Sequence, residues 1–301
     1  MIPTFSALRH RKSLARIAAG GICCAAIFGF ASSELRPPIA SADAATTPAT
    51  TIPLTGELTQ GGWARGTVPP RTQALTLDGK PVAVADDGGF FIAFDRDAGM
   101  QASLDARLEN GKILHRDIAI SPRNWQIEHV NIARRQGGPS EAFMEIRQPE
   151  LAMIRAARDK RTGAQGWRQT FAWPVKGRIS GRFSSQRIYR GEPGSYHSGI
   201  DITSGTSGTP FVAPADGVVI LAATKPFTLE GNLLMIDHGE GLNSAFLHCS
   251  QILVQEGQHV KQGQVIGKIG MSGRATGPHL HWSIKWHDAR LDPILLTGPM
   301  N

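Results

Sequence analysis

The stretch Gly208-Thr-Pro-Phe-Val-Ala-Pro-Ala-Asp-Gly217-Val-Val-Ile220 carries short runs of valine and isoleucine bounded by glycine and proline. A second stretch, Gly257-Gln-His-Val-Lys-Gln-Gly263-Gln-Val-Ile-Gly267-Lys-Ile-Gly270, repeats the pattern. Bounded runs of β-branched residues predict short strands that are joined at tight corners. We therefore expect the C-terminal part of the chain, residues 166–301, to form a flattened β-barrel or sandwich. Lipoyl and biotin carrier domains have a similar pattern, but they modify a lysine beside a methionine, and this chain has no Met-Lys pair.

Two further regions precede this domain. Residues 56–120 alternate apolar and polar residues between turn signals such as Asp78-Gly79 and Asn110-Gly111, which predicts a small Ig-like β-sandwich. Residues 121–165 form a linker in which a connecting helix is expected at about 139–161, with Pro149 as a residue that can begin it. The basic end of this helix, Arg155 to Arg161, is expected to be a solvated face; the alternative is an anion-binding site.

Composition excludes several classes of protein. Hydrophobic residues make up 41% of the 301 residues and charged residues 19%, which excludes a disordered chain. The 34 glycines and 19 prolines predict a turn-rich, mainly β protein and exclude long helical bundles. The net charge of +7 is not accompanied by a zinc knuckle or a dense basic stripe, so no nucleic acid is expected as a partner. Cys249 is the only cysteine in the predicted folded part, which excludes disulfides there.

The N-terminus has the pattern of an export segment. Residues 1–44 contain a basic cluster from Arg9 to Arg16 and an apolar run from Ile17 to Phe30, and they end in Ala42-Asp43-Ala44. This segment is either a cleaved signal peptide or a membrane anchor formed by residues 14–33, which would be the only contact with a membrane. Residues 45–55, rich in Pro and Thr, are predicted to be a tether. The protein is therefore expected to be exported to the periplasm or cell envelope.

Four of the ten histidines lie in three short motifs: Tyr196-His197-Ser-Gly-Ile-Asp201, Phe246-Leu-His248 and Gly277-Pro-His279-Leu-His281-Trp282. Residues two apart on a strand point to the same face, so His279 and His281 are expected to project into one site. Imidazole and carboxylate donors without competing cysteines favour zinc. Three protein ligands and one open position are typical of catalytic zinc, and further histidines could handle protons. Spacing alone does not decide whether His279 or His281 is the ligand.

These motifs resemble those of the lysostaphin/LytM-type zinc metallopeptidases, whose substrates are peptide bonds of peptidoglycan. The resemblance covers about residues 173–293, including Arg182-Phe183 and the loop Gly270-Met-Ser-Gly-Arg-Ala-Thr-Gly-Pro278. It implies that the C-terminal domain has the duplicated hybrid motif of these peptidases. The preceding β domain and helix also resemble the N-terminal region of exported members.

The resemblance also implies a site. It assigns one Zn²⁺ per chain to His197, Asp201 and His281, and it gives His248 and His279 the role of catalytic histidines.

Three residues near these motifs are candidates for lining the substrate groove, namely Tyr196, Arg182 and Trp282. Ser283 departs from the family pattern, because many members have glutamate there, and this departure concerns substrate fit more than zinc binding. We therefore expect a zinc metalloendopeptidase that acts on peptidoglycan stem peptides. The alternative is a catalytically inactive protein that binds the wall and regulates other peptidoglycan hydrolases.

Overall fold

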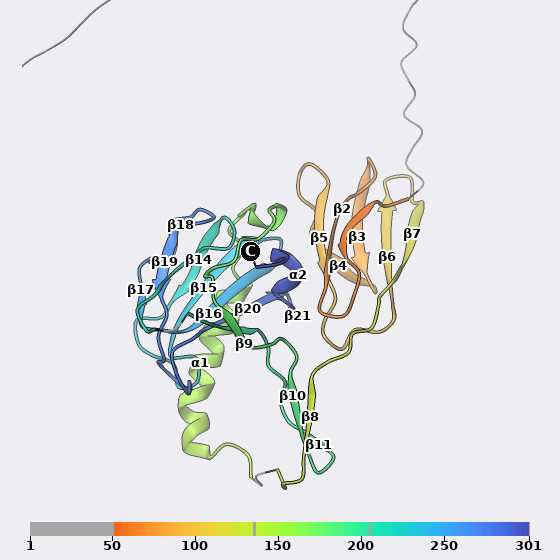
Figure 1. Ribbon diagram of the computed structural model, residues 1–301. Helices are drawn as coiled ribbons and strands as arrows, with labels where there is room; N and C mark the ends of the chain where they lie inside the picture. Colours follow the sequence, from red (N-terminus) through yellow and green to blue (C-terminus); the bar gives the residue numbers. More distant parts are fainter. Residues whose placement is uncertain (1–50, 135–136, 205, 301) are drawn as a thin grey trace, which may run out of the picture. The chain divides into compact units, whose positions relative to one another are not determined.

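The computed structural model describes residues 51–134, 137–204 and 206–300, and its mainly β architecture confirms the expected fold class (Figure 1). The predicted export segment and most of the predicted tether lie outside the described residues. In the described ranges, no helix combines the length and the apolar character that crossing a bilayer requires.

The first group of strands forms a sandwich of two sheets. One sheet has the order β1-β2-β5 and the other the order β4-β3-β6-β7. The strands are β1 (Leu54–Glu57), β2 (Trp63–Thr67), β3 (Thr72–Leu77), β4 (Lys80–Val82), β5 (Gly89–Ala93), β6 (Gln101–Leu108) and β7 (Ile113–Ala119). This is the immunoglobulin-type order with the fourth strand moved to the second sheet, so the predicted Ig-like sandwich is confirmed.

One turn of the sandwich lies where the sequence predicts it, whereas the sandwich begins earlier than predicted. Asp78 and Gly79 join β3 to β4 with φ angles of 49° and 75°, as a two-residue type I′ turn requires. The predicted tether, however, extends too far. Ile52 is 1% exposed and belongs to the hydrophobic core, and β1 begins at Leu54, because the apolar residues at the end of the Pro/Thr-rich stretch alternate into the sandwich.

The linker contains β8 (Ile127–Val130) and helix α1 (Glu141–Asp159). The helix begins at Glu141, eight residues before Pro149. It is preceded by the N-cap Ser140, whose side chain accepts a hydrogen bond from the Phe143 amide at 3.2 Å. The prediction that Pro149 begins the helix is therefore wrong, because the serine cap supplies the stronger start signal. Strand β8 pairs in parallel with β10 (Gln186–Tyr189), which also pairs with β11 (Glu192–Pro193).

The C-terminal part consists of a large sheet and a small sheet. The large sheet has the order β18-β14-β15-β16-β20-β12-β9, with β21 added to β20, and the small sheet has the order β13-β19-β17. Neither sheet closes into a barrel within the described residues. The elements are β9 (Arg178–Gly181), β12 (Ile200–Thr203), β13 (Pro210–Val212), β14 (Gly217–Ala222), β15 (Asn232–Gly239), β16 (Leu242–Cys249), β17 (Gln251–Ile252), β18 (His259–Val260), β19 (Val265–Lys268), β20 (Leu280–Trp286), β21 (Ala289–Leu291), the short helix α2 (Ile294–Thr297) and a 3₁₀ turn (Gly166–Arg168).

The two similar stretches of sequence become partners in this architecture. Strand β13 of the first pairs with β19 of the second, and β14 of the first pairs with β18 of the second. The repeated pattern therefore encodes two segments that pair with each other antiparallel.

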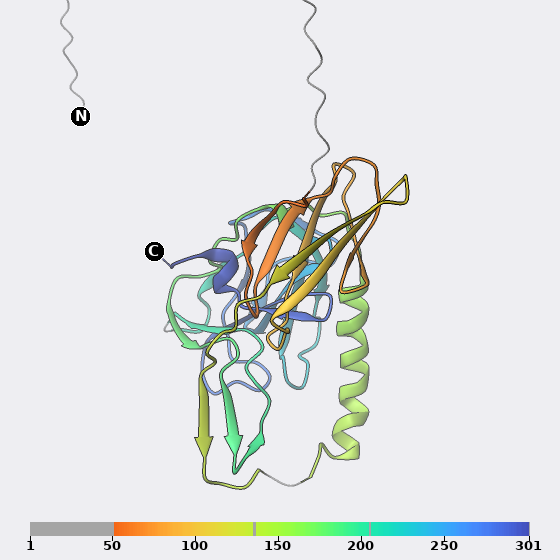
Figure 2. The same cartoon turned by 90° about the vertical axis from the view of Figure 1, so that its right-hand side faces the viewer.

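Helix α1 covers part of one face of the large sheet (Figures 1 and 2). Ile154 and Ala157 of the helix pack on apolar side chains of β14, β15 and β16. Nη1 and Nη2 of the buried Arg147 donate to the two oxygens of the Glu230 carboxylate, each at 2.7 Å. The opposite face of the sheet carries the main core, which includes Trp282 and Phe246.

Strand β21 and the residues after it also contact the sandwich and the linker that follows it. The Arg290 amide donates to Asp95 Oδ2 at 2.8 Å, and Arg123 forms an ion pair with the buried Asp292 at 2.7 Å. Main-chain and charged contacts of this kind fix the position of Arg290 relative to β20.

A buried polar chain crosses the core beside the large sheet. Trp282 Nε1 donates to Ser244 Oγ at 3.2 Å, and Ser244 Oγ lies 2.8 Å from His238 Nε2. His238 Nδ1 lies 2.9 Å from the Asp216 carbonyl and must donate to it. His238 is a fully buried residue of β15, which extends through Gly239 before the turn begins.

Burial lowers the pKa of His238 to about 4, from an ordinary value of 6.5. Between these values the unfolded chain binds a proton that the folded chain rejects, so stability falls as the pH falls. We predict that native protein loses about 2 kcal/mol through this residue between pH 7 and pH 5. In His238→Gln, urea unfolding should show a correspondingly smaller loss over this interval, whereas the exposed-site control His259→Gln should follow the native protein. An equal loss in His238→Gln and the native protein would contradict the prediction.

Candidate metal centre and active site

The register of two neighbouring strands builds the centre of the site. In the antiparallel pair β12–β20, Asp201 lies directly opposite His281. Their neighbours Ile200, Ile202 and Trp282 are all 0% exposed on the core side. Because alternate residues of a strand point to opposite faces, the carboxylate and the imidazole project together on the face away from the core.

His197 completes the cluster from the segment before β12. Its Nε2 lies 3.1 Å from Asp201 Oδ1 and 3.0 Å from His281 Nδ1, and these last two atoms are 2.9 Å apart. His197 Nδ1 lies 3.0 Å from the Arg182 carbonyl, so Nδ1 carries the proton and Nε2 offers its lone pair. Three donor atoms therefore converge on one point.

This arrangement fits a zinc ion. The candidate donor atoms of His197, Asp201 and His281 all lie within 4.8 Å of one another. Ligands bound at 2.0–2.1 Å in a tetrahedral site lie about 3.3 Å apart, close to the separations in this cluster. Two nitrogens and one carboxylate oxygen are donors that zinc accepts, and three protein donors leave a fourth position open.

Two glycines leave room for these side chains. A Cβ atom added to Gly199 would lie 2.9 Å from His281 Nε2 and 2.4 Å from the Trp282 carbonyl oxygen. A Cβ atom added to Gly181 would lie 2.4 Å from Asp201 Oδ2. Glycine is the residue that permits this close approach of backbone to the donor set.

The charges of the cluster are coupled. Burial acts to raise the pKa of Asp201, but hydrogen bonds with His197 and His281 hold this pKa far below its usual range. Burial lowers the pKa of His281, whereas the pKa of His197 is raised, since the Asp201 carboxylate outweighs the effect of burial there. The carboxylate is thus kept ionised, the form in which it can bind a cation.

The other two histidines of the motifs lie beside this cluster. The rings of His248 and His279 have centroids 5.0 Å apart, and His279 Nε2 lies 3.6 Å from Asp201 Oδ1. His248 Nδ1 lies 2.8 Å from the Ser272 carbonyl, and His279 Nδ1 lies 2.8 Å from the Gly277 carbonyl. Both carbonyls fix the proton on Nδ1 and leave Nε2 of each ring free for chemistry. Burial lowers the pKa of His248, which favours its neutral form.

The conformation of His248 is a feature that sequence reasoning missed. Its φ angle is 63°, in the left-handed region, and the pairing of β15 with β16 is irregular between Asn232 and Leu234, opposite this end of β16. Bulges beside active sites re-aim side chains, and histidine is among the residues enriched at positive φ. The next residue, Cys249, is 0% exposed, as expected of a buried apolar residue, and burial raises the pKa of its thiol to about 12.

The three candidates for lining the substrate groove lie in different environments. Tyr196 is half-buried, and its hydroxyl accepts a hydrogen bond from Arg290 Nη1 at 2.9 Å. Arg182 is exposed and contributes its backbone carbonyl to His197. Trp282 is 0% exposed and stacks on Phe246 in the core, so the prediction that it lines the groove is wrong. The reason is strand alternation: a residue next to His281 must face the other way.

The same alternation could have identified two residues that the sequence analysis did not assign to the site. Ser283 and Lys285 follow His281 at intervals of two on β20, and both line a pocket next to it. Arg158 lines the same pocket from the basic end of α1. The position of Arg158 in the pocket depends on how the helix packs on the sheet, which the sequence pattern does not determine.

Comparison with known proteins agrees with this geometry. Residues 195–293 match the profile of Peptidase family M23. The chain is 41% identical over 118 residues to the Peptidoglycan DD-endopeptidase ShyA of Vibrio cholerae, a match that covers 37% of this chain and 26% of that protein. It is 37% identical over 129 residues to a Lipoprotein NlpD/LppB homolog of Pseudomonas aeruginosa, covering 43% of this chain and 39% of that protein.

The first three curated relatives, ShyA among them, are matched over only about a quarter of their own length. A solved structure of a putative peptidase M23 from Pseudomonas aeruginosa is similar over more of the chain. It superposes with a TM-score of 0.62 at 28% identity and covers 81% of this chain and 96% of that one. Together with the His/Asp/His cluster, these similarities identify the C-terminal part of this chain as a Peptidase family M23 domain.

Proposed function

We propose that this protein is an exported, zinc-dependent endopeptidase that hydrolyses peptide cross-links of peptidoglycan. The observation that carries the proposal is the convergence of His197, Asp201 and His281 inside an M23 domain, with distances that suit a tetrahedral ion. Similarity to a protein named as a peptidoglycan DD-endopeptidase supports the choice of substrate. One Zn²⁺ per chain would be held by these three residues.

Zinc in such a site supplies Lewis acidity, which lowers the pKa of water to about 7 and polarises a carbonyl group. The chain's own residues handle the protons. His248 Nε2 takes the proton of the attacking water and passes it to the amine nitrogen of the leaving peptide. When protonated, His248 and His279 donate Nε2–H hydrogen bonds to the oxygen that gains negative charge.

The direct test is digestion of purified, cross-linked peptidoglycan by the full chain. We expect dimeric muropeptides to decrease and monomers to accumulate, because the proposed reaction cuts between stem peptides and leaves glycan strands intact. Sequencing of the products identifies the bond. Zinc-loaded protein that binds the wall and leaves the ratio of dimeric to monomeric muropeptides unchanged would favour the alternative, an inactive regulator of other hydrolases.

A matched pair of variants separates ligation from proton transfer. His281→Ala removes a proposed ligand and should lose the zinc found in native protein, as measured by elemental analysis. His248→Ala should keep that zinc and lose activity by about 10²- to 10⁴-fold, because its proposed role is acid–base catalysis. Full zinc retention in His281→Ala, or activity of His248→Ala within a few-fold of native, would contradict the assignment.

Export rests on the sequence of residues 1–44, with its basic cluster and apolar run. A fusion of residues 1–60 to a reporter that is active only after export should give a signal. Replacing Arg9 and Arg11 with Glu should weaken that signal. A reporter that stays inactive and cytoplasmic would contradict an envelope location.

A further inference from the structure

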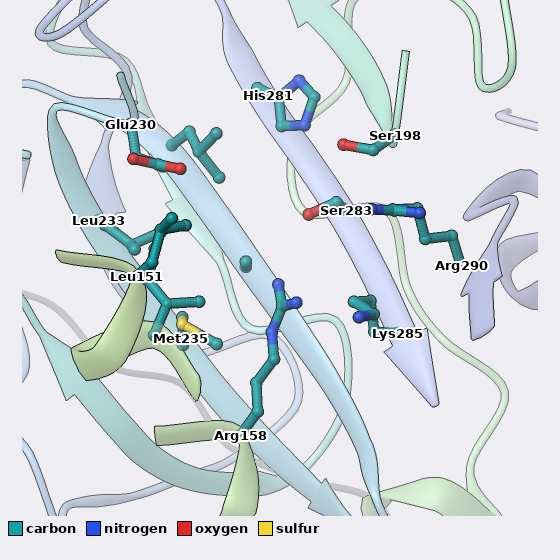
Figure 3. Close-up of a pocket in the computed structure, with 13 residues that line it drawn as sticks. Leu151, Arg158, Ser198, Glu230, Leu233, Met235, His281, Ser283, Lys285 and Arg290 are labelled. Carbon is teal, nitrogen blue, oxygen red and sulfur yellow. The ribbon is translucent and has the colours of Figure 1, made fainter. Parts of the chain in front are cut away.

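A pocket of about 220 Å³ lies beside the His/Asp/His cluster, between α1 and the face of the large sheet (Figure 3). His281 and Ser198 lie at one end and Arg158 at the other, with Lys285 and Arg290 on one side and Leu151 and Met235 on the other. A substrate bound at the cluster therefore has space to extend along the sheet beneath the helix.

Strand geometry aligns one wall of this pocket. His281, Ser283 and Lys285 alternate on β20, so all three face the pocket. Arg290 of β21 lies directly opposite Lys285 in the β20–β21 register. Two like charges at directly opposed positions repel each other, and Arg158 adds a third positive charge from the last turn of α1.

No described carboxylate pairs directly with these three cations, although Asp95, Asp288 and Glu230 act on them from further away. Among the described residues, Arg158, Lys285 and Arg290 form no ion pair within 4.0 Å. Glu230, the acidic residue of the lining, is instead bound by Arg147 through two hydrogen bonds of 2.7 Å. Arg290 Nη1 donates to the neutral hydroxyl of Tyr196.

Single groups also show that the positive charge lacks a partner. Arg158 Nε is buried without any hydrogen-bond partner in the described part of the chain. Burial, followed by repulsion from Arg158 and Arg290, lowers the pKa of Lys285 to about 8. Burial and the Arg290 charge lower the pKa of Arg158 to about 10. Cations that are partly withdrawn from water in this way are costly unless an anion pairs with them.

We propose that Arg158, Lys285 and Arg290 form a subsite that binds a carboxylate of the peptide substrate. The inference rests on the proposed function, because it places the reacting bond at the His/Asp/His cluster. Lys285 follows His281 by four residues, about 13 Å along a strand, so the carboxylate belongs within about four residues of the scissile bond of an extended peptide. Ser283, between them, is a neutral hydroxyl that does not compete for the cations.

The subsite explains a choice of substrate that the metal ligands alone do not provide. Zinc acts on the carbonyl of any peptide, whereas three converging cations favour peptides with a free carboxylate and disfavour amidated ones. The carboxylate can be the C-terminus of a stem peptide or a side chain, and amidating each in turn distinguishes the two.

Binding is measured in the zinc-loaded His248→Ala background, so that the peptide is not consumed. The probes are one cross-linked stem peptide with free carboxylates and the same peptide amidated at one carboxylate at a time. We expect one amidation to weaken binding by about tenfold. Adding Lys285→Gln should weaken binding of the free peptide by about tenfold and that of the amidated peptide by less than twofold.

Two further variants control this result. Lys285→Arg keeps the charge and should retain the preference for the free carboxylate, which guards against loss of folding as an explanation. Lys112→Gln removes an exposed lysine of the sandwich, outside the pocket, and should change neither affinity. Equal affinity for all the peptides, no measurable binding of any, or an equal loss in Lys112→Gln would overturn the subsite. Hydrolysis of cross-links by native protein without any carboxylate preference would overturn the subsite and leave the proposed function standing. Preferential binding of the free carboxylate without any hydrolysis would support the subsite and overturn the proposed function.

Discussion

The antiparallel register of β12 and β20 is the constraint on which the site depends. It sets Asp201 opposite His281, and the buried Ile200, Ile202 and Trp282 anchor that register from the core side. A slip by one residue would turn every one of these side chains to the wrong face. The cluster is thus stabilised by the same burial that stabilises the sheet.

Backbone carbonyls outside the donor set orient the histidine rings of the site. Those of Arg182, Ser272 and Gly277 each hold Nδ1 of one histidine, and in all three rings Nε2 is the atom that remains available. Because these carbonyls lie in loops between strands, the loops are as important to the chemistry as the histidines. The glycines beside the donor set serve the same end by allowing backbone to come close.

Much of this could be predicted from sequence, for identifiable reasons. Glycine-bounded strands predicted the β architecture, and the strand period placed His279 and His281 on one side, where the structure brings both to Asp201. The same period, applied one residue further, would have excluded Trp282 from the groove. The left-handed conformation of His248 and the position of Arg158 depend on contacts between distant segments, which no local pattern encodes. Pro149 was misread because a serine cap earlier in the chain overrides it.

The central claim is that one ion is bound by His197, Asp201 and His281. The most direct measurement is a crystal structure of the zinc-loaded protein with anomalous data collected on both sides of the zinc absorption edge. We predict one strong anomalous peak per chain, about 2.0–2.2 Å from His197 Nε2, Asp201 Oδ1 and His281 Nδ1. A peak bound elsewhere, or a zinc-saturated protein with no peak at this cluster, would contradict it.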